Sequence, residues 1–498
     1  MSKVYLVGAG PGDPLLITLK GKQILEQAHV VLYDHLANEA LLNLAPRSAN
    51  RIYVGKKRAE HPVTQDEIIS LMVERARAGQ TVVRLKGGDP YLFGRGGEEA
   101  EALHAAGIDF EVVPGVTSPS GIAAYTGVPL THRDHTSVVT FVTGHHPEAI
   151  DWASVSQAET LVIFMGLTQA GEIAAALIRA GRSPDTPAMA VRWGTRAFQT
   201  VVTSTLAELP ASIQSSGMKP PATIILGEVV RLRESLNWFE RLPLFGQRIV
   251  VTRAAEQAGD LTARLWSLGA EAIELATIAF EPPSDSAPLD QAIANLESYH
   301  WLIFTSANGV RFFLDRLDAS ARDLRHIRAR LCAIGPATAA ALERLHLKVD
   351  LCPKDFVAES LVEAFSKIPL QGQRVLLPRA AVARDLIPTE LTRLGAHVDV
   401  VEAYQTVAPE FVHEHAREVF STKPDWVLFT STSTVNNFIS AAGRSALDGV
   451  KVATIGPITS DAVRRRGIEV SVEASPFTID GLVDKIVAKI RYPGANRG

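Results

Sequence analysis

The chain has 498 residues, of which 46% are hydrophobic and 21% charged, and its formal net charge is −4. This composition is typical of a soluble globular protein with about three compact units. The charge offers no general attraction to nucleic acid or to an anionic membrane, and no apolar run approaches the roughly 18 residues of a transmembrane helix. We therefore expect a cytoplasmic protein.

The two cysteines, Cys332 and Cys352, have no His or Cys partner in a metal-ligand spacing. We therefore expect no metal site and no structural disulfide, which suits a reducing compartment. Free cysteines usually pack as small apolar residues, so we expect both side chains to be buried.

The first predicted element is a strand over residues 4–7, and it runs into a glycine-rich loop at residues 8–13. Such loops can cradle a dinucleotide, but that fingerprint needs a third glycine where this chain has Asp13. Pro11 and Pro14 also crowd the turn in which a phosphate-binding helix would begin. The loop by itself is equally compatible with an ordinary tight turn between a strand and a helix.

A second strand, at residues 30–33, ends at Asp34. A carboxylate in this position can serve as a helix N-cap before His35 and Leu36, or as a proton acceptor at a strand end. The residues alone favour the N-cap.

A helix is predicted near residues 66–78, because Thr64 and Glu67 can form a capping box and apolar residues recur at helical spacing. The strand that follows, at residues 81–85, opens into a loop with glycines at positions 87, 88, 94, 96 and 97. Asp89 places a carboxylate in this loop. Glycine lets a ligand approach the main chain closely, so the loop is a candidate binding site.

A third special loop, at residues 113–119, follows another strand. Open α/β sheets bind their ligands at the carboxyl ends of the strands. Three such loops at strand ends therefore indicate an enzyme site.

A break near residues 134–138 separates this unit from a second lobe, whose predicted strands include residues 160–164 and 222–226. Proline and glycine then punctuate a short segment, and a new strand begins at residue 248. The predicted division of the chain is residues 1–240, a linker at residues 241–246, and residues 247–492.

The second half repeats itself, since WLIFTSANGVRFF (301–313) is echoed by WVLFTSTSTVNNF (426–438), and LCAIGPATAAAL (331–342) by VATIGPITSDAV (452–463). Each repeat is a strand, a loop rich in Ser, Thr, Gly or Pro, and a helix, which predicts two similar α/β domains facing each other. Helix N-termini favour anions, so these loops are candidate carboxylate-binding sites. Any one pair can also be a duplicated turn without a ligand.

Ordered motifs in both halves carry a family resemblance. VGAGPGDPLLITLKG, VVLYDHL, VVRLKGGDPYLFGRGGEE, VVPGVTSPSG and GVPLTHRD resemble the tetrapyrrole methyltransferase family, and within it the uroporphyrinogen-III C-methyltransferases, over residues 3–238. The FTS, IGPxT and EAYQT segments resemble the uroporphyrinogen-III synthases over residues 246–490. The resemblance implies an α/β chain in which a two-lobed methyltransferase fold precedes a synthase fold of two interleaved, repeated domains.

The resemblance also implies a bifunctional enzyme. The second half would close hydroxymethylbilane to uroporphyrinogen III, and the first would methylate that product twice from S-adenosylmethionine. The resulting precorrin-2 leads to siroheme or cobalamin. The resemblance implies no metal. It does imply a homodimer that pairs through the methyltransferase half. One alternative makes the second half a non-catalytic tetrapyrrole-binding module; another is an RNA or protein methyltransferase, for which the chain lacks a basic face.

The same resemblance assigns site residues by motif. In the first half, Asp34 matches the family's proposed base and Lys56 its proposed acid. The candidate cofactor-binding residues are Pro11, Gly87, Gly88, Asp89, Leu92, Thr117, Ser118, Met165, Gly194 and Ala222. Candidate cations for the carboxylate-rich substrate are Arg51, His132 and Arg133. In the second half, Tyr404 matches the favoured acid, and the predicted carboxylate-binding residues are Ser306, Thr338, Ser431 and Thr459.

Overall fold

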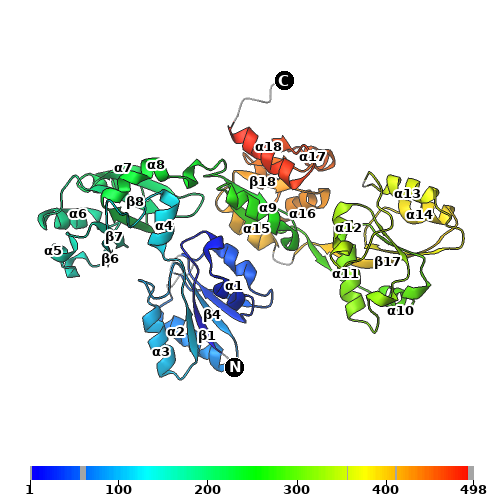
Figure 1. Cartoon of the computed structure of the whole chain (residues 1–498), viewed down its shortest axis with the longest axis horizontal. Helices are drawn as coiled ribbons and strands as arrows, with labels where there is room; N and C mark the ends of the chain where they lie inside the picture. Colours follow the sequence, from blue (N-terminus) through cyan, green and yellow to red (C-terminus); the bar gives the residue numbers. More distant parts are fainter. Residues whose placement is uncertain (1–2, 56–62, 356, 410–411, 492–498) are drawn as a thin grey trace.

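The computed structural model describes residues 3–55, 63–355, 357–409 and 412–491. Its strands form four sheets of five strands each, one in each of four α/β units (Figure 1). We call these units the first lobe, the second lobe, the third domain and the fourth domain, in the order in which the chain enters them. The predicted fold class, with two lobes followed by two α/β domains, is confirmed.

The first lobe holds an all-parallel sheet in the order β3-β2-β4-β1-β5. Its strands are β1 (Val4–Gly8), β2 (Val30–Tyr33), β3 (Asn50–Tyr53), β4 (Val82–Lys86) and β5 (Phe110–Val113). Its helices are α1 (Leu19–Leu25), α2 (Gln65–Arg77), α3 (Gly96–Ala105), α4 (Ser118–Thr126) and the 3₁₀ turns η1 (Pro14–Leu16) and η2 (Glu39–Leu44). Because the strands are parallel, their carboxyl ends share one edge, and all three glycine loops emerge there.

The N-terminus of α2 forms as the sequence predicts. The Thr64 hydroxyl accepts from the Glu67 backbone N–H at 3.3 Å, and the Glu67 carboxylate accepts from the Thr64 N–H at 2.6 Å. Ile68 and Met72 bury the apolar face of the helix against the sheet. The capping box therefore fixes where the helix begins, and the apolar spacing fixes which side faces the core.

The second lobe holds a mixed sheet in the order β6-β7-β10-β8-β9, in which only β6 and β7 are parallel neighbours. Its strands are β6 (Val139–Thr143), β7 (Thr160–Phe164), β8 (Pro187–Arg192), β9 (Thr200–Thr205) and β10 (Ala222–Leu226). Its helices are α5 (Trp152–Val155), α6 (Ala170–Arg179), α7 (Leu209–Ser216), α8 (Arg233–Leu236) and the turns η3 (Pro147–Ala149), η4 (Glu228–Leu232) and η5 (Phe239–Arg241).

The third and fourth domains are interleaved along the chain. The third domain has the sheet β12-β11-β18-β19-β20, and the fourth has β13-β17-β16-β14-β15. The third-domain strands are β11 (Arg248–Val251), β12 (Glu271–Glu274), β18 (Trp426–Phe429), β19 (Lys451–Thr454) and β20 (Val472–Glu473). The fourth-domain strands are β13 (Ala279–Glu281), β14 (Trp301–Phe304), β15 (Arg330–Ala333), β16 (Arg374–Ala380) and β17 (His397–Val407). The chain thus leaves the third domain after β12 and returns to it only after β17.

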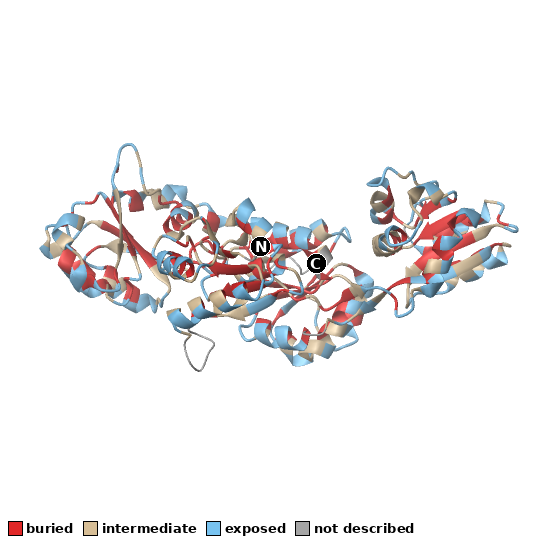
Figure 2. Cartoon of the chain, turned by 90° about the horizontal axis from the view of Figure 1, so that it is seen from below, coloured by how far each residue is buried: buried red, intermediate tan, exposed pale blue. Residues whose placement is uncertain are grey.

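Helices flank both of these sheets. Those of the third domain are α9 (Ala255–Ser267), α15 (Val412–Phe420), α16 (Thr432–Ala442), α17 (Pro457–Arg464), α18 (Ile479–Arg491) and η8 (Arg444–Leu447). Those of the fourth domain are α10 (Ala287–Ala294), α11 (Ala307–Asp318), α12 (Pro336–Glu343), α13 (Ala358–Ser366), α14 (Leu386–Arg393), η6 (Leu296–Ser298) and η7 (Leu324–His326). Buried residues gather on the strands of each unit, and the fourth domain joins the rest through a narrow connection (Figure 2). Within each repeat, β14-α11 and β15-α12 correspond to β18-α16 and β19-α17, as the internal repeat predicts.

The two cysteines differ in environment. Cys332 lies on β15 and is fully buried, which raises the pKa of its thiol. Cys352 is exposed, so the expectation that both would be buried was wrong for this residue. The residue before Cys352, Leu351, forms a β-bridge with Cys332 of β15, and the residue after it, Pro353, lies in a loop. Pairing with the sheet therefore ends just before Cys352.

The segment predicted to be a linker, residues 241–246, is packed rather than free. Leu244 is fully buried in the core of the third domain, and its N–H donates to the Leu268 carbonyl at 2.9 Å. Phe245 contacts the Phe239 ring, which in turn contacts Tyr125 on α4. The connection therefore belongs to the folded structure of both halves.

Leu244→Ala should destabilise the third domain by about 2–5 kcal/mol, the usual cost of truncating a fully buried leucine. The measurement is the temperature at which the second half loses its activity. The temperature at which the first half loses its own activity is the internal reference. Leu345→Ala is the matched control, because Leu345 is 37% exposed. Equal inactivation temperatures for the two variants would contradict a structural role for the connection.

Candidate functional site

Three glycine loops of the first lobe interlock at the carboxyl edge of its sheet. A Cβ added to Gly8 would lie 2.5 Å from Gly115 and 2.7 Å from the Gly88 carbonyl oxygen. Gly10 and Gly88 exchange two backbone hydrogen bonds of 3.2 and 2.7 Å. Only glycine allows the backbones to approach this closely, so the sequence requires glycine for the contact between loops.

Asp89 ties two of these loops together. One carboxylate oxygen accepts from the Gly115 N–H at 3.0 Å, and the other accepts from the Tyr91 N–H at 2.8 Å. Gly88 lies against Ser118, since an added Cβ would be 3.3 Å from the Ser118 hydroxyl. Thr117 is the N-cap residue of α4, and its hydroxyl makes no capping bond. Asp89 therefore holds the loop in place through backbone groups.

The family resemblance assigns Asp89 to the cofactor site, and on that assignment Asp89→Ala should weaken S-adenosylhomocysteine binding by about 10- to 100-fold, because two charge-assisted hydrogen bonds to backbone N–H groups are lost. Titration calorimetry on the whole chain measures this. Asp109→Ala removes an exposed carboxylate at the opposite end of the sheet and should leave the affinity unchanged. Wild-type affinity for Asp89→Ala would place Asp89 outside the cofactor site.

Loops of the second lobe meet the first-lobe loops across the gap between the lobes. The Thr195 hydroxyl accepts from the Asp13 N–H at 2.8 Å, and the His35 and Trp193 rings lie 5.1 Å apart. Gly194 lies between these contacts and packs against Ile122 of α4. Residues 193–195 thus bring the second lobe onto the first.

Backbone strain is concentrated at this junction. Six non-glycine residues of the described chain have positive φ, and five of them lie in its loops: Phe93, Arg95, Met165, Trp193 and Thr195. For a β-branched residue such as Thr195, with φ of +70°, this conformation is a genuine outlier. Strained residues persist where the surroundings over-determine them, typically at functional sites.

Exposed apolar side chains line the same junction. Leu36 is 48% exposed, Phe93 39% and Met165 51%. Leu36 lies against Gly87, and the Phe93 ring lies 4.8 Å from that of Phe164, the residue before Met165. An apolar rim therefore runs from the first lobe to the second beside the glycine loops. Such a rim around polar backbone groups is typical of a small-molecule site.

Asp34 lies at the end of β2 in a charged network. One oxygen accepts from the Leu36 N–H at 3.0 Å, and the other pairs with Arg84 Nη2 at 3.0 Å. The carboxylate closes a turn here instead of capping a helix, because the next helical turn, η2, begins at Glu39 and is capped by Asn38. The Asp34 side chain is 23% exposed, so it remains accessible from the junction.

The network continues into the core beneath β4. The Glu99 carboxylate is fully buried; one of its oxygens accepts from Lys86 at 2.8 Å and from Gln65 at 2.9 Å, and lies 3.4 Å from Arg84 Nε. Burial and the neighbouring Arg84 guanidinium lower the pKa of Lys86, although Glu99 opposes this. Buried charges need partners, so these contacts fix the Arg84 guanidinium beside Asp34.

The remaining first-half candidates are placed unevenly. Pro11 packs on Gly121 of α4, Leu92 lies in the Asp89 loop, and Ala222 pairs with Arg192, just before Trp193. All three thus adjoin the junction. Lys56 lies outside the described residues.

Arg51 has a structural task. Its Nε, Nη1 and Nη2 atoms all donate to backbone carbonyls of residues 42–49. These bonds hold the turn that follows η2. This local role accounts for the guanidinium contacts in the structure, and the role of Arg51 in substrate binding stays a prediction.

His132 and Arg133 lie in an exposed turn at the far end of the second lobe. Thr136 closes this turn, and its hydroxyl lies 3.2 Å from that of Thr160, the first residue of β7. Met165 follows the last residue of β7. It therefore lies about 16 Å from Thr160, which is the length of a strand of this size. Within one chain, the structure does not bring His132 and Arg133 to the glycine loops.

A second candidate site lies in the fourth domain. The Tyr404 hydroxyl is 3.0 Å from that of Ser306, which also accepts from the Gly309 N–H at 2.9 Å as the N-cap of α11. Tyr404 is 7% exposed and stacks on Phe312, with ring centroids 5.5 Å apart. Tyr404 pairs with Ala380, the last residue of β16, so its hydroxyl lies at the carboxyl edge of the sheet.

The carboxyl edges of the third and fourth domains face each other. Gln257 on α9 donates to Asn308 on α11 at 3.2 Å, and also accepts from Arg253 at the end of β11. The predicted carboxylate-binding residues lie at helix starts on both edges: Ser306, Thr338, Ser431 and Thr459. Ser306 and Ser431 use their hydroxyls as N-caps, whereas Thr338 and Thr459 are buried within the first helical turn. The repeated loops therefore lie at the carboxyl edges of two sheets whose loops contact each other.

Sequence reasoning missed the residues that support the junction: His35, Arg84, Lys86, Glu99, Trp193 and Thr195. One signal was available for Arg84 and Lys86. Both lie in β4, a central strand whose other residues are apolar and buried, so each charge needs a buried partner. The role of Thr195 left no local signal, because it depends on a contact with Asp13, 182 residues away.

Comparisons with known proteins match the two halves of the chain to two different families. The model of the tetrapyrrole (corrin/porphyrin) methylases matches residues 3–210, and that of uroporphyrinogen-III synthase matches residues 259–484. A porphyrin biosynthesis protein HemD of Ruminiclostridium josui is 36% identical over 494 residues, which are 97% of both chains. The siroheme synthase of Azotobacter vinelandii is 52% identical over 244 residues, which are 48% of this chain and 53% of that protein.

Solved structures resemble each half separately. A uroporphyrin-III C-methyltransferase from Thermus thermophilus, complexed with S-adenyl homocysteine, is 44% identical and aligns with 46% of this chain and 100% of its own, with a TM-score of 0.40. A mutant uroporphyrinogen III synthase from the same bacterial species is 17% identical. It aligns with 49% of this chain and 99% of its own, with a TM-score of 0.38. In the described part of the chain, no helix is long and apolar enough to cross a membrane, and no group of three His, Cys, Asp or Glu side chains could hold a metal ion.

Proposed function

Because the chain belongs to the family in which a tetrapyrrole methylase is joined to a uroporphyrinogen-III synthase, we propose that it makes uroporphyrinogen III and then methylates it. The third and fourth domains close hydroxymethylbilane to uroporphyrinogen III. The two lobes transfer two methyl groups to that product and release precorrin-2. The observation that carries the proposal is the presence of both candidate sites, each at the carboxyl edges of its sheets, in one chain.

The junction between the lobes suits S-adenosylmethionine. Leu36, Phe93 and Met165 provide apolar surface, and the glycine loops offer main-chain groups without intervening side chains. The hydroxyls of Thr117 and Ser118 stand at the start of α4 beside Gly88. When bound, the cofactor supplies a methyl group on a positively charged sulfur. We propose that the loops orient this methyl group toward the gap between the lobes.

We propose Asp34 as the base for methyl transfer. A pyrrole carbon of the substrate forms the new bond to the methyl carbon while the bond between methyl and sulfur breaks, and its electron pair stays on sulfur. The macrocycle then loses one proton for each methyl group gained. The partly exposed Asp34 carboxylate can accept that proton, and Arg84 holds it in place. Lys56 remains the proposed acid on family resemblance alone.

We propose Tyr404 as the acid for ring closure. The terminal hydroxyl of hydroxymethylbilane takes up a proton and leaves as water, which leaves a carbon electrophile. A carbon of the last ring supplies the electron pair for the new bond to this electrophile. The macrocycle closes with that ring inverted and loses one proton, so only water is lost overall. The Tyr404 hydroxyl is supported by Ser306 and fixed between the Phe312 and Phe280 rings. The N-termini of α11, α12, α16 and α17 would hold the substrate's carboxylates through backbone N–H groups. This chemistry needs no metal.

The direct test supplies hydroxymethylbilane with and without S-adenosylmethionine and identifies the tetrapyrroles formed by mass spectrometry and absorbance. Precorrin-2 should form with the methyl donor, and uroporphyrinogen III without it. Only uroporphyrinogen I in both reactions would mean that the second half is a non-catalytic module. Uroporphyrinogen III in both would mean that the first half is inactive.

We further propose a cytoplasmic homodimer that pairs through the methyltransferase half, on family resemblance. The family leads to siroheme or to cobalamin, and both begin at precorrin-2. Several relatives matched over the first half are siroheme synthases, which favours the siroheme branch. Light scattering of the purified chain tests the dimer.

A further inference from the structure

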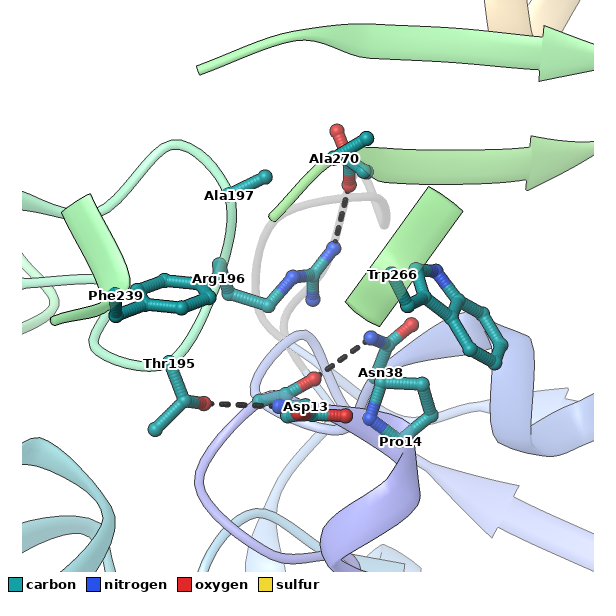
Figure 3. A pocket seen from close by; sticks show the side chains of 11 residues that line it. Asp13, Pro14, Asn38, Thr195, Arg196, Ala197, Phe239, Trp266 and Ala270 are labelled. Carbon is teal, nitrogen blue, oxygen red and sulfur yellow. Dashed lines mark hydrogen bonds and ion pairs between the residues drawn. The ribbon is translucent and has the colours of Figure 1, made fainter. Parts of the chain in front are cut away.

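The first glycine loop of the methyltransferase half is pressed against the loop that follows β8. Gly12 has φ of +148°, and a Cβ added there would lie 2.9 Å from the Thr195 hydroxyl and 3.0 Å from the Arg196 stem. Asn38 donates to the Gly12 carbonyl at 2.7 Å from the other side (Figure 3). The Gly12 peptide is therefore held between the two lobes, next to Pro11.

Arg196 continues from this contact into the synthase half. Its guanidinium pairs with Glu271 at 2.7 Å, and the second Glu271 oxygen lies 3.2 Å from Arg248 Nε. Glu271 begins β12 and pairs in register with Arg248 on β11, so the sheet of the third domain fixes it. The Arg196 and Glu271 side chains are 17% and 16% exposed, so solvent screens them less than an ordinary surface pair.

The surrounding contacts join three units at this point. The Gly246 N–H donates to the Ala197 carbonyl at 3.0 Å, directly beside Arg196. A cavity of about 30 Å³ lies at the junction, bounded by Gly12 and Asn38 of the first lobe, Arg196 of the second, and Trp266 of the third domain. The synthase half thus forms one wall of the region that holds the Gly12 loop.

The residues next to Arg196 have a strained backbone, so their conformation depends on contacts with the third domain. Trp193 and Thr195 both have positive φ, and Arg196 is the next residue in the chain. A strained segment keeps its conformation only while neighbouring contacts hold it. Two contacts hold this segment. In the first lobe, the Asp13 N–H donates to the Thr195 hydroxyl, and in the third domain, Glu271 forms an ion pair with Arg196.

We infer that Glu271, a residue of the synthase half, is a positioning residue for cofactor binding in the methyltransferase half. It acts through Arg196, which holds both the strained 193–195 loop and the Gly12 turn. The inference rests on the proposed function of the junction between the lobes. It implies that the methyltransferase half binds its cofactor fully only when the third domain is folded against it.

The test measures S-adenosylhomocysteine affinity by calorimetry on full-length variants. Glu271→Gln and Arg196→Gln should each raise the dissociation constant by about 5- to 30-fold, in the range of ordinary couplings between sites. Because the two residues act as one pair, the double variant should be no weaker than the weaker single variant. The KM for S-adenosylmethionine should rise while kcat changes little.

Controls separate positioning from general damage. Asp484→Asn removes the same charge from the outer face of the third domain, where Asp484 pairs with Arg264, and should leave the affinity unchanged. Formation of uroporphyrinogen III by Glu271→Gln reports whether its own domain is intact, and this rate should match wild type. With that rate intact, wild-type affinity in Glu271→Gln, or additive losses in the double variant, would overturn the inference. A wild-type chain that fails to bind S-adenosylhomocysteine would instead contradict the proposed function.

Discussion

Asp34→Asn is expected to lower methyl transfer by about 10²- to 10⁴-fold, the usual contribution of a general base, while S-adenosylhomocysteine affinity changes only a few-fold. Asparagine keeps the Asp34 Oδ1 position, so it can still accept from the Leu36 N–H and close the same turn. It cannot accept a proton at neutral pH, and its amide nitrogen would face Arg84 in place of a carboxylate oxygen. The loss should therefore appear in kcat.

Single-turnover methylation of supplied uroporphyrinogen III measures the chemical step directly. Asp151→Asn is the matched control: Asp151 also accepts a backbone N–H, from Ala153 at 3.1 Å, but it lies in an exposed turn of the second lobe. That variant should methylate normally. Near-normal turnover by Asp34→Asn would reduce Asp34 to a turn residue and move the base elsewhere.

Tyr404→Phe is expected to slow ring closure by about 10- to 100-fold. This loss is smaller than the largest contributions of general acids, because the substrate's hydroxyl also leaves without an enzyme. Phenylalanine keeps the ring contacts with Phe312 and Phe280 and removes only the hydroxyl. Ser306 keeps its bond from the Gly309 N–H, so α11 retains its cap. Methylation of supplied uroporphyrinogen III should continue unchanged.

The ratio of uroporphyrinogen I to III formed from hydroxymethylbilane is the sensitive measurement, because spontaneous closure gives the uninverted isomer. Tyr299→Phe is the matched control in the same domain. The Tyr299 hydroxyl is buried and donates to Asp399 at 2.7 Å, but it precedes β14, at the opposite edge of the sheet. An isomer ratio in Tyr404→Phe equal to that of wild type would remove Tyr404 from the mechanism.

Local chemistry explains why parts of the fold were predictable from the sequence. The strands predicted at residues 160–164 and 222–226 coincide with β7 and β10. The capping box at Thr64 sets the start of α2, and the repeats of the second half become equivalent strands and helices in two sheets. In each case the signal lies within a dozen residues, as a cap, an apolar run or a repeated turn.

Contacts between distant segments left much weaker signals. The glycines at positions 8, 88 and 115 are individually visible, but their mutual contact depends on the order of strands in the sheet. The packing of Leu244 was hidden because proline and glycine suggested a free linker. The family resemblance proposed His132 and Arg133 as substrate-binding residues. They lie in a turn closed by Thr136, whose hydroxyl contacts Thr160 at the start of β7, because strand direction decides which end of the lobe a turn occupies.

The insertion of the fourth domain into the third also sets an order of events during synthesis on the ribosome. The Arg248 N–H bonds to the carboxylate of Asp425, 177 residues later, and β18 pairs with β11 along the same edge. Until β18 emerges, that edge of β11 has no partner, and unpaired edges invite pairing with other chains. The sheet of the fourth domain is complete by residue 407 and can close earlier. A ribosome that pauses between residues 280 and 425 therefore holds a nascent chain whose open β-edge is exposed to aggregation.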